Sequence, residues 1–176
     1  MWLVALDSGT TSTRAWLVED GRLVGGVHEH VGARDVAQGR SREWLAGQLS
    51  SLVQQVLEQH GLTASQVEAV VGFGMVTSEL GIEEVRHLTA PVDSSQLARA
   101  VAKDPGRTLG PPLGDGRPVP FYLVPGVRCG GDGADGRRDF MRGEETEVVG
   151  LLADGQQTLP SASPTDLVIP RRRARS

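Results

Sequence analysis

Apolar and polar residues change their spacing several times along this chain, and each change predicts a different element. Residues 2–7 form a short apolar run, and residues 13–19 and 22–28 are rich in β-branched and aromatic side chains. Runs of this kind, bounded by turn residues, predict three β-strands. Asp20-Gly21 separates the last two runs, and both residue types tolerate the positive φ of a two-residue hairpin. The pattern therefore predicts an antiparallel three-strand opening.

A helical period replaces this pattern between Ser41 and His60. Apolar residues recur there at spacings of three and four, which predicts an amphipathic helix near residues 42–59, with Ser41 as N-cap and Gly61 as C-cap. The apolar run at 67–74 predicts a central strand, buried on both faces and parallel to the first strand through a right-handed crossover. This order predicts an α/β fold with a mixed sheet and flanking helices.

The elements expected after Thr77 are shorter. We expect a helix at 93–102 capped by Asp93, a loop at 104–118, a strand at 118–126, a glycine-rich loop at 129–139, and helical periodicity from Met141 to Leu152. The Pro-, Ser- and Arg-rich end has no sustained period. We therefore divide the chain into a lobe at residues 1–153 and an unstructured or atypical tail at residues 154–176.

Composition limits the classes of protein to which this chain can belong. Its 176 residues, of which 39% are hydrophobic, suit one well-buried domain. The net charge of −4 gives no sign of a nucleic-acid partner, and we interpret the basic RRRARS end as a solvated tail. The chain has a single cysteine, Cys129, and no apolar run of the length of a signal or membrane segment. We therefore expect a soluble, cytoplasmic protein.

The turn after the first predicted strand carries the strongest chemical signal. The stretch LDSGTTSTRAW contains Asp7 at the strand end, Gly9, Thr10, Thr11 and Ser12 in the turn, and Arg14 in the next strand. A phosphate-binding turn needs a glycine that lets backbone N–H groups approach the anion, hydroxyls that donate to it, and a carboxylate that holds Mg²⁺ through water. The planar Arg14 guanidinium suits a phosphate oxygen. The alternative for this turn is an ordinary Ser- and Thr-rich hairpin. A P-loop nucleotide site is excluded, because the sequence contains no G-x-x-x-x-G-K-[ST] motif.

Three stretches together resemble a known family. DSGTTSTRA, followed by the Asp-Gly hairpin, resembles the first phosphate motif of the sugar-kinase, heat-shock-protein-70 and actin superfamily. GMVTSELGIEEVRHLTAPV at 74–92 and DFMRGEETEVVGLL at 139–152 resemble the 2-dehydro-3-deoxygalactonokinase family. The resemblance implies a ribonuclease-H-like (actin-like ATPase) lobe over residues 2–153. It also implies phosphorylation of the 6-hydroxyl of 2-dehydro-3-deoxy-D-galactonate, with ATP and Mg²⁺ as cofactors.

Under this resemblance, the substrate-binding residues can be assigned by their chemistry. The substrate is an anionic keto acid, so Arg142 can clamp its carboxylate, while Glu144 and Glu145 can accept from sugar hydroxyls. Ser78 follows the buried strand, where α/β sheets bind ligands, and can donate to the substrate. The alternative for the three charged residues is a solvated helix start.

Carboxylates are also needed for the chemical step. Asp139 is the preferred group to position the attacking hydroxyl and take its proton, ahead of Asp132 and Asp135, because Asp is common in glycine-rich loops for turn reasons alone. Asp7 is assigned both as a catalytic residue and as the ligand of Mg²⁺.

The C-terminal part departs from the family pattern. Family members continue with a Leu-Pro-Gly-Thr-His-like loop and a second lobe that completes the nucleotide site, whereas this chain continues from Leu159-Pro160 as SASPTDLVIP. A fragment, an alternative C-terminus or a shifted reading frame would each give this pattern. Two functions therefore stay open, a sugar-acid kinase lobe, whose activity in this form is itself open, and a non-catalytic actin-like lobe that binds a ligand or partner protein. The expected partners are a sugar acid and a nucleotide, with a homo-oligomer possible and neither nucleic acid nor a membrane.

Overall fold

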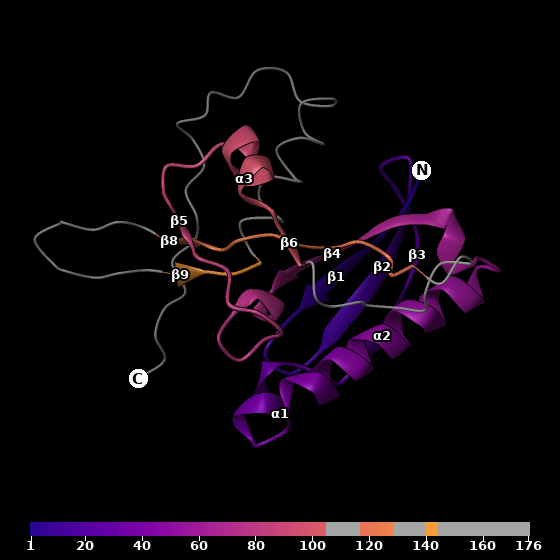
Figure 1. Cartoon of the computed structure of the whole chain (residues 1–176), viewed down its shortest axis with the longest axis horizontal. Coiled ribbons are helices and arrows are strands. Elements are labelled where there is room, and N and C mark those ends of the chain that lie inside the picture. Colours follow the sequence, from indigo (N-terminus) through magenta and orange to yellow (C-terminus); the bar gives the residue numbers. More distant parts are fainter. Residues whose placement is uncertain (105–116, 129–139, 144–176) are drawn as a thin grey trace, which may run out of the picture.

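Two sheets organise the part of the chain that the structure, a computed structural model, describes: residues 1–104, 117–128 and 140–143. A six-stranded sheet has the order β3-β2-β1-β4-β7-β6, and a three-stranded sheet, β5-β8-β9, lies at one end of it (Figure 1). The strands of the first sheet are β1 (Trp2–Ser8), β2 (Thr13–Glu19), β3 (Arg22–Glu29), β4 (Val67–Gly74), β6 (Ala102–Asp104) and β7 (Phe121–Leu123). The second sheet contains β5 (Leu88–Thr89), β8 (Val127–Arg128) and β9 (Phe140–Met141). The helices are α1 (Ala33–Ala37), α2 (Arg42–Gln59) and α3 (Ser94–Ala100), with single 3₁₀ turns η1 (Ala64–Gln66) and η2 (Met75–Thr77).

The predicted three-strand opening is confirmed. β1 pairs antiparallel with β2 along its whole length, and β2 pairs antiparallel with β3. Asp20 and Gly21 connect β2 to β3 with φ angles of 49° and 79°, the conformation that this type of two-residue hairpin requires.

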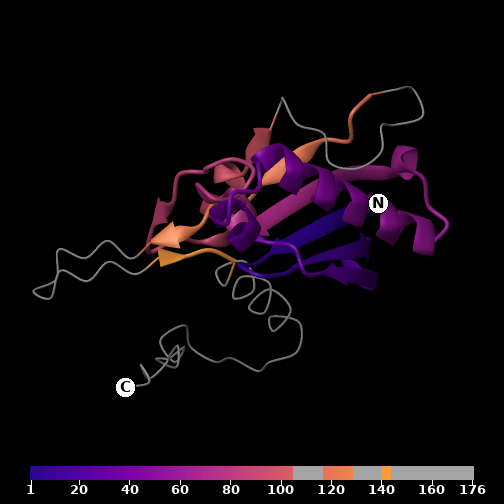
Figure 2. The ribbon, with the colours of Figure 1, turned by 90° about the horizontal axis from the view of Figure 1, so that it is seen from below.

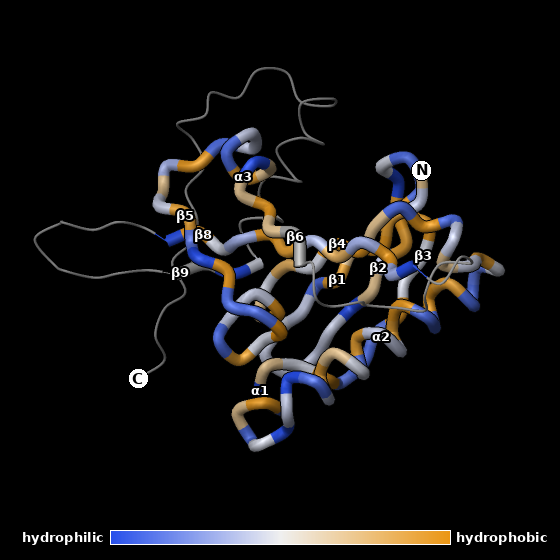
Figure 3. The backbone as a smooth tube through the Cα atoms, viewed as in Figure 1, coloured by the Kyte–Doolittle hydropathy of each residue, from blue (hydrophilic) through white to orange (hydrophobic). Residues whose placement is uncertain are grey.

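The helix predicted at 42–59 is α2, which lies across one face of the six-stranded sheet (Figure 2). The Trp44 N–H donates to the Ser41 hydroxyl at 3.1 Å, so Ser41 is the N-cap as predicted. Gly61 follows the C-terminal end of the helix with a φ of 65°, a conformation that glycine adopts without strain. Apolar and polar residues alternate along α2 (Figure 3), so one side of the helix can pack on the sheet while the other faces solvent.

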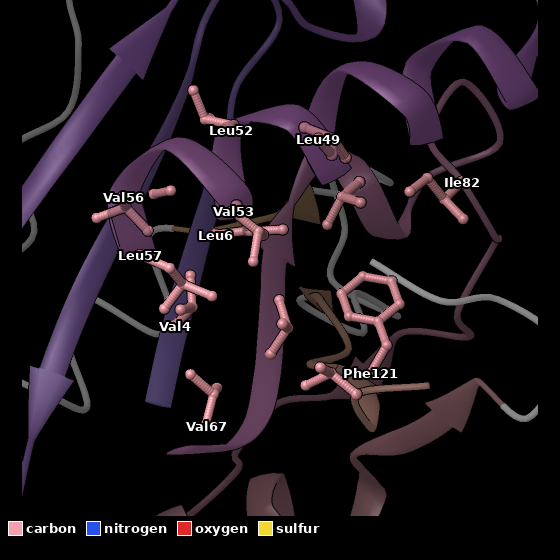
Figure 4. Packing of buried hydrophobic residues seen from close by; sticks show 14 of the residues in the cluster. Val4, Leu6, Leu49, Leu52, Val53, Val56, Leu57, Val67, Ile82 and Phe121 are labelled. Atoms are coloured by element: carbon pink, nitrogen blue, oxygen red, sulfur yellow. The ribbon is translucent and has the colours of Figure 1, made fainter. Parts of the chain in front are cut away.

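The hydrophobic core lies between α2 and the strands β1, β2 and β4 (Figure 4). Alternation along β1 buries Val4, Leu6 and Ser8 and leaves Asp7 partly exposed, because successive side chains of a strand point to opposite faces. β4 pairs in parallel with β1 on one side and with β7 on the other. The prediction of a central parallel strand reached through a helix is therefore confirmed, and with it the mixed α/β fold.

The region after β4 differs from its prediction in three places. Asp93 caps α3 as expected, but the helix ends at Ala100, and residues 102–104 pair with β7 instead. The strand expected at 118–126 is shorter, because flanking prolines have no N–H to donate to a sheet. Met141 belongs to β9 and not to a helix, since pairing with β8 replaces the helical period there.

Several predictions lie outside the described residues. They are most of the loop expected at 104–118, the loop at 129–139, the helical period after residue 143, and the division between a lobe and a tail at residues 153 and 154. Among the residues that the structure does describe, no helix is both long enough and apolar enough to span a membrane.

Candidate functional site

The turn between β1 and β2 is closed by a backbone hydrogen bond, from the Gly9 N–H to the Ser12 carbonyl at 2.8 Å. The hydroxyls that flank it are buried: Thr13 Oγ1 donates to the Val31 carbonyl at 2.7 Å and lies 3.3 Å from Ser8 Oγ. Thr10 and Thr11 at the tip are exposed. Buried hydroxyls thus fix the base of the turn, while the tip is available to a ligand.

A short helix that the sequence pattern did not predict supports this turn from behind. The N–H groups of Ala33 and Arg34 in α1 donate to the carbonyls of Gly9 and Thr10 at 3.3 and 2.8 Å. A Cβ atom at Gly32 would lie 2.6 Å from the Gly9 carbonyl oxygen, so glycine permits this close approach. Because N–H and C=O of a trans peptide point in opposite directions, the N–H groups of Thr10 and Thr11 point away from α1.

Asp7 and Arg14 face each other on neighbouring strands. They are directly paired in the β1–β2 register, and Arg14 Nη1 lies 3.1 Å from Asp7 Oδ2. The Asp7 side chain is 20% exposed and that of Arg14 50%, so this ion pair contributes little to stability. Both groups remain accessible beside the turn.

Asp7 is suited to the Mg²⁺ role assigned to it. The ion pair with Arg14 uses Oδ2, and the carboxylate has a second oxygen, Oδ1. Mg²⁺ usually keeps several waters and takes only one or two carboxylates together with phosphate oxygens. Among the described residues, no group of three or more His, Cys, Asp or Glu side chains could hold a metal ion. A single accessible carboxylate therefore fits Mg²⁺ that arrives with a phosphate.

The segment after β4 turns sharply next to β1. Gly74 has a φ of 79°, and a Cβ atom there would lie 2.4 Å from the Ser8 carbonyl oxygen. Thr77 is fully buried and donates through Oγ1 to the Gly74 carbonyl at 2.9 Å. Ser78 donates through Oγ to the Met75 carbonyl at 2.7 Å. Local side-chain to backbone hydrogen bonds therefore set the course of this segment.

Arg142, which follows β9, is bound to the same segment. Its Nη1 donates to the carbonyl of Thr77 and, at 2.8 Å, to Thr77 Oγ1. Its Nη2 lies 3.4 Å from the Val85 carbonyl and 3.3 Å from His87 Nδ1. Gly143, with a φ of 109°, lies beside Gly74, and an added Cβ would be at an ordinary contact distance of 3.4 Å from the Gly74 Cα. Two segments 65 positions apart in the sequence are thus held together, and a bidentate clamp of a substrate carboxylate by Arg142 would have to exchange some of these bonds.

These elements surround a cavity of about 620 Å³. Its lining residues are Gly9, Thr10, Met75, Ser78, Glu79, Leu80, Glu84, His87 and Arg142. The structure therefore brings together, from three separate segments, four of the residues assigned from the sequence: Gly9, Thr10, Ser78 and Arg142. A smaller hollow of about 250 Å³ between α2 and the end of β3 contains none of the assigned residues.

The other assigned residues do not line this cavity within the described part of the chain. Asp7, Thr11, Ser12 and Arg14 lie in or next to the turn, whereas Asp139, Glu144 and Glu145 lie outside the described residues. Sequence reasoning missed Glu79, Glu84 and His87 in the lining. The segment that carries the family resemblance contains all three, but no spacing rule marks them.

The electrostatics of the cavity centre on Arg142 and His87. Burial lowers the pKa of His87, and the nearby charges of Arg142 and Arg128 lower it further, while Glu84 opposes them. His87 is therefore neutral near pH 7, in agreement with its Nδ1 atom facing an Arg142 N–H that can only donate.

Comparisons with known proteins agree with this arrangement. The model of the 2-keto-3-deoxy-galactonokinase family matches residues 7–164. A solved Sinorhizobium meliloti protein, described as a putative 2-dehydro-3-deoxygalactonokinase, is 22% identical and superposes with a TM-score of 0.61 over 86% of this chain. The chain spans 43% of the length of that protein. YeaZ from Pseudomonas aeruginosa, at 22% identity, aligns with a TM-score of 0.33 over 46% of this chain and 33% of its own.

A comparison with curated protein sequences finds no match. The fold rests on the superposition with the Sinorhizobium meliloti protein and on the strand order, and the family rests on a match that extends over most of the sequence. The chain therefore belongs to the 2-keto-3-deoxy-galactonokinase family.

Proposed function

We propose that this chain is the lobe of a sugar-acid kinase that binds phosphate and sugar acid, for transfer of the γ-phosphoryl group of ATP to the 6-hydroxyl of 2-keto-3-deoxygalactonate. The observation that carries this proposal is that one cavity is lined by the turn residues Gly9 and Thr10 and by Ser78 and Arg142. Phosphoryl transfer requires the phosphate and the attacking hydroxyl to be held next to each other. The cavity volume of about 620 Å³ suits a ligand of this size.

The turn residues form the phosphate end of the site. The N–H groups of Thr10 and Thr11, which point away from α1, donate to phosphate oxygens, and the hydroxyls of Thr11 and Ser12 add further donors. Arg14 supplies a guanidinium at the edge of the turn. Asp7 holds Mg²⁺, which when bound neutralises and orients the phosphate oxygens.

The other end of the cavity binds the sugar acid. The Ser78 hydroxyl exchanges its hydrogen bond to the Met75 carbonyl for one to the substrate, and the charge of Arg142 attracts the substrate carboxylate from the cavity wall. Glu144 and Glu145, which follow Arg142 closely in the sequence, accept from sugar hydroxyls. Asp139, three positions before Arg142, orients the attacking hydroxyl and takes its proton.

A coupled assay of ATP turnover with and without 2-keto-3-deoxygalactonate tests this proposal. We expect turnover that depends on the sugar acid, and we expect Asp7→Ala to abolish it without a change in melting temperature, because Asp7 is partly exposed and not part of the core. Asp20→Ala, which removes an exposed carboxylate in the next turn, is the matched control and should keep full activity.

Two results would contradict the proposal. Unchanged turnover in Asp7→Ala would remove the phosphate role of the turn. Binding of the sugar acid without turnover under any condition would favour a non-catalytic lobe that binds the same ligand.

A further inference from the structure

A guanidinium and a neutral imidazole meet at one wall of the cavity. Arg142 Nη2 is 3.3 Å from His87 Nδ1, and both residues line the cavity. A guanidinium has no acceptor atom, so Nδ1 must accept from it, and the neutral imidazole carries its proton on Nε2. This contact can exist only while His87 is neutral.

The guanidinium cannot easily move away from His87. Arg142 also donates to Thr77 and to the Val85 carbonyl, and these partners keep its charge in place. Arg128 of β8 is anchored by its Nε atom, which donates to Thr89 Oγ1 at 3.2 Å. Protonation of His87 would therefore add a third positive charge to a region where two are already fixed.

Carboxylates near His87 offset this charge only in part. Glu84, on the same segment, raises the pKa of His87, whereas burial, Arg142 and Arg128 lower it. Glu79 also lines the cavity, and both glutamates are exposed. An anion placed between Arg142 and His87 would supply the missing negative charge at shorter range than either glutamate.

We propose that one oxygen of the sugar-acid carboxylate binds on the cavity side of the contact between Arg142 Nη2 and His87 Nδ1, within hydrogen-bond distance of both atoms, and that His87 takes up one proton from solvent in the same step. The oxygen replaces Nδ1 as the acceptor for Nη2 and accepts a second hydrogen bond from the new Nδ1–H. No covalent bond of the substrate changes, and the only other reactant is the proton. Hydrogen bonds between charged groups are shorter and stronger than neutral ones, so this exchange favours an anionic ligand.

This inference rests on the proposed function and names the residue that selects a sugar acid over a neutral sugar. A neutral sugar of the same length would find Nδ1 unprotonated and could not provide the charge that stabilises the imidazolium. His87 thus becomes a specificity residue, which contacts the substrate but takes no part in phosphoryl transfer.

The coupling has a fixed sign. If the carboxylate raises the pKa of His87, then protonation of His87 strengthens carboxylate binding by the same factor. The pH window lies between the pKa of His87 in the complex and its lower pKa in the free protein. Within this window, the affinity for the sugar acid rises as pH falls, by at most about tenfold per pH unit for one proton. Above and below this window, affinity does not change with pH through His87.

Imidazole NMR signals provide a direct test on the whole chain. The four histidines are followed through a pH titration with and without 2-keto-3-deoxygalactonate, and His87→Gln assigns the His87 signal. We expect the sugar acid to raise the pKa of His87, whereas the signals of His28 and His30, which are exposed at the end of β3, should not change when the ligand is added. If His87→Gln does not fold, backbone-linked correlations assign the same signal in the unmodified protein.

Calorimetry over the same pH range gives a second, independent measurement. The unmodified protein should bind the sugar acid more tightly as pH falls, whereas His87→Gln should bind it more weakly and without this pH dependence. His28→Gln is the matched control and should keep the full pH dependence, because His28 lies away from the cavity.

Pyruvate separates this inference from the proposed function, since it has the same 2-keto carboxylate without the sugar chain. A His87 pKa that rises with pyruvate, in a protein that does not phosphorylate the sugar acid, would support the carboxylate site and contradict the kinase. Turnover that depends on the sugar acid while the pKa of His87 stays constant would overturn the inference and leave the kinase proposal intact. A pKa that responds to neither carboxylate, or a pH dependence that survives in His87→Gln, would also overturn it.

Discussion

The hydrophobic core and the segment that follows β4 are held together by different kinds of interaction. In the core, α2 packs on the sheet through side chains with almost no exposed surface, such as Leu49 and Val53. In the segment after β4, two arginines bind main-chain carbonyls of residues 77–85: Arg42, at the start of α2, donates through Nη2 to Glu79 at 2.5 Å, and Arg142 donates to Thr77 and Val85. The stabilisation from apolar packing is proportional to the buried area and has little direction, whereas hydrogen bonds have strict geometry. We therefore expect the core to determine stability and the arginine contacts to determine the shape of the cavity.

The largest effect on stability should come from a change in the hydrophobic core. Leu49 is fully buried in the core, and truncation to alanine leaves a cavity as well as removing buried apolar surface. Leu49→Ala should lower the free energy of unfolding by about 2–5 kcal/mol, measured by urea denaturation. The neighbouring exposed residue gives the control, since Gln48→Ala should change stability by no more than about 0.5 kcal/mol. Equal losses of unfolding free energy in the two variants would contradict the expectation that the core determines stability.

A smaller loss of stability, but a larger loss of binding, should follow from Arg142→Lys. A lysine has a single nitrogen and cannot reach both the acceptor of Nη1 at Thr77 and those of Nη2 at Val85 and His87. The free energy of unfolding should fall by about 1.5–3 kcal/mol, and calorimetry should show weaker binding of the sugar acid. The control is Arg86→Lys, which keeps the charge at an exposed position of the same segment. If both variants bind the sugar acid as the unmodified protein does, the cavity does not depend on this guanidinium.

The smallest effect, and the most specific, concerns the support of the turn. Gly32→Ala would place a Cβ atom 2.6 Å from the Gly9 carbonyl oxygen. Overpacking of this kind costs about 1–3 kcal/mol of stability. It should also displace the turn and so weaken nucleotide binding. Gly47→Ala is the opposite case, because nothing lies within 4 Å of the new atom. An alanine within an exposed helix should raise stability by about 0.5–1 kcal/mol. Nucleotide binding that survives in Gly32→Ala would mean that α1 does not position the turn.

The same division explains how much could be predicted from the sequence. β1 to β4 and α2 follow from alternation, from the Asp-Gly hairpin and from the period of α2, all of which are local patterns. The short α1 and the two-residue strands β5, β8 and β9 have no period of their own and form because distant segments pair with them. Local pattern gave no means to predict those elements.

For the candidate site, residues in recognisable segments were found and their partners were not. Gly9, Ser78 and Arg142 were assigned by residue type and resemblance, and all line one cavity. Two acceptors of Arg142, at Thr77 and Val85, are main-chain carbonyls, which every residue has, so no side-chain pattern marks them. His87 is a single histidine in a segment without periodicity, and its environment depends on residues 128 and 142. Only the three-dimensional arrangement places His87 in the cavity.

The close approach of Gly74 to Ser8 has a mechanical consequence. At this point the ends of β4 and β1 meet through main-chain atoms, because a Cβ atom at Gly74 would lie 2.4 Å from the Ser8 carbonyl oxygen. Contacts between side chains can absorb a small displacement by changing rotamer, but a contact between backbones has no such freedom. A shift of Gly74 would therefore reach the strand that leads into the phosphate turn almost undiminished.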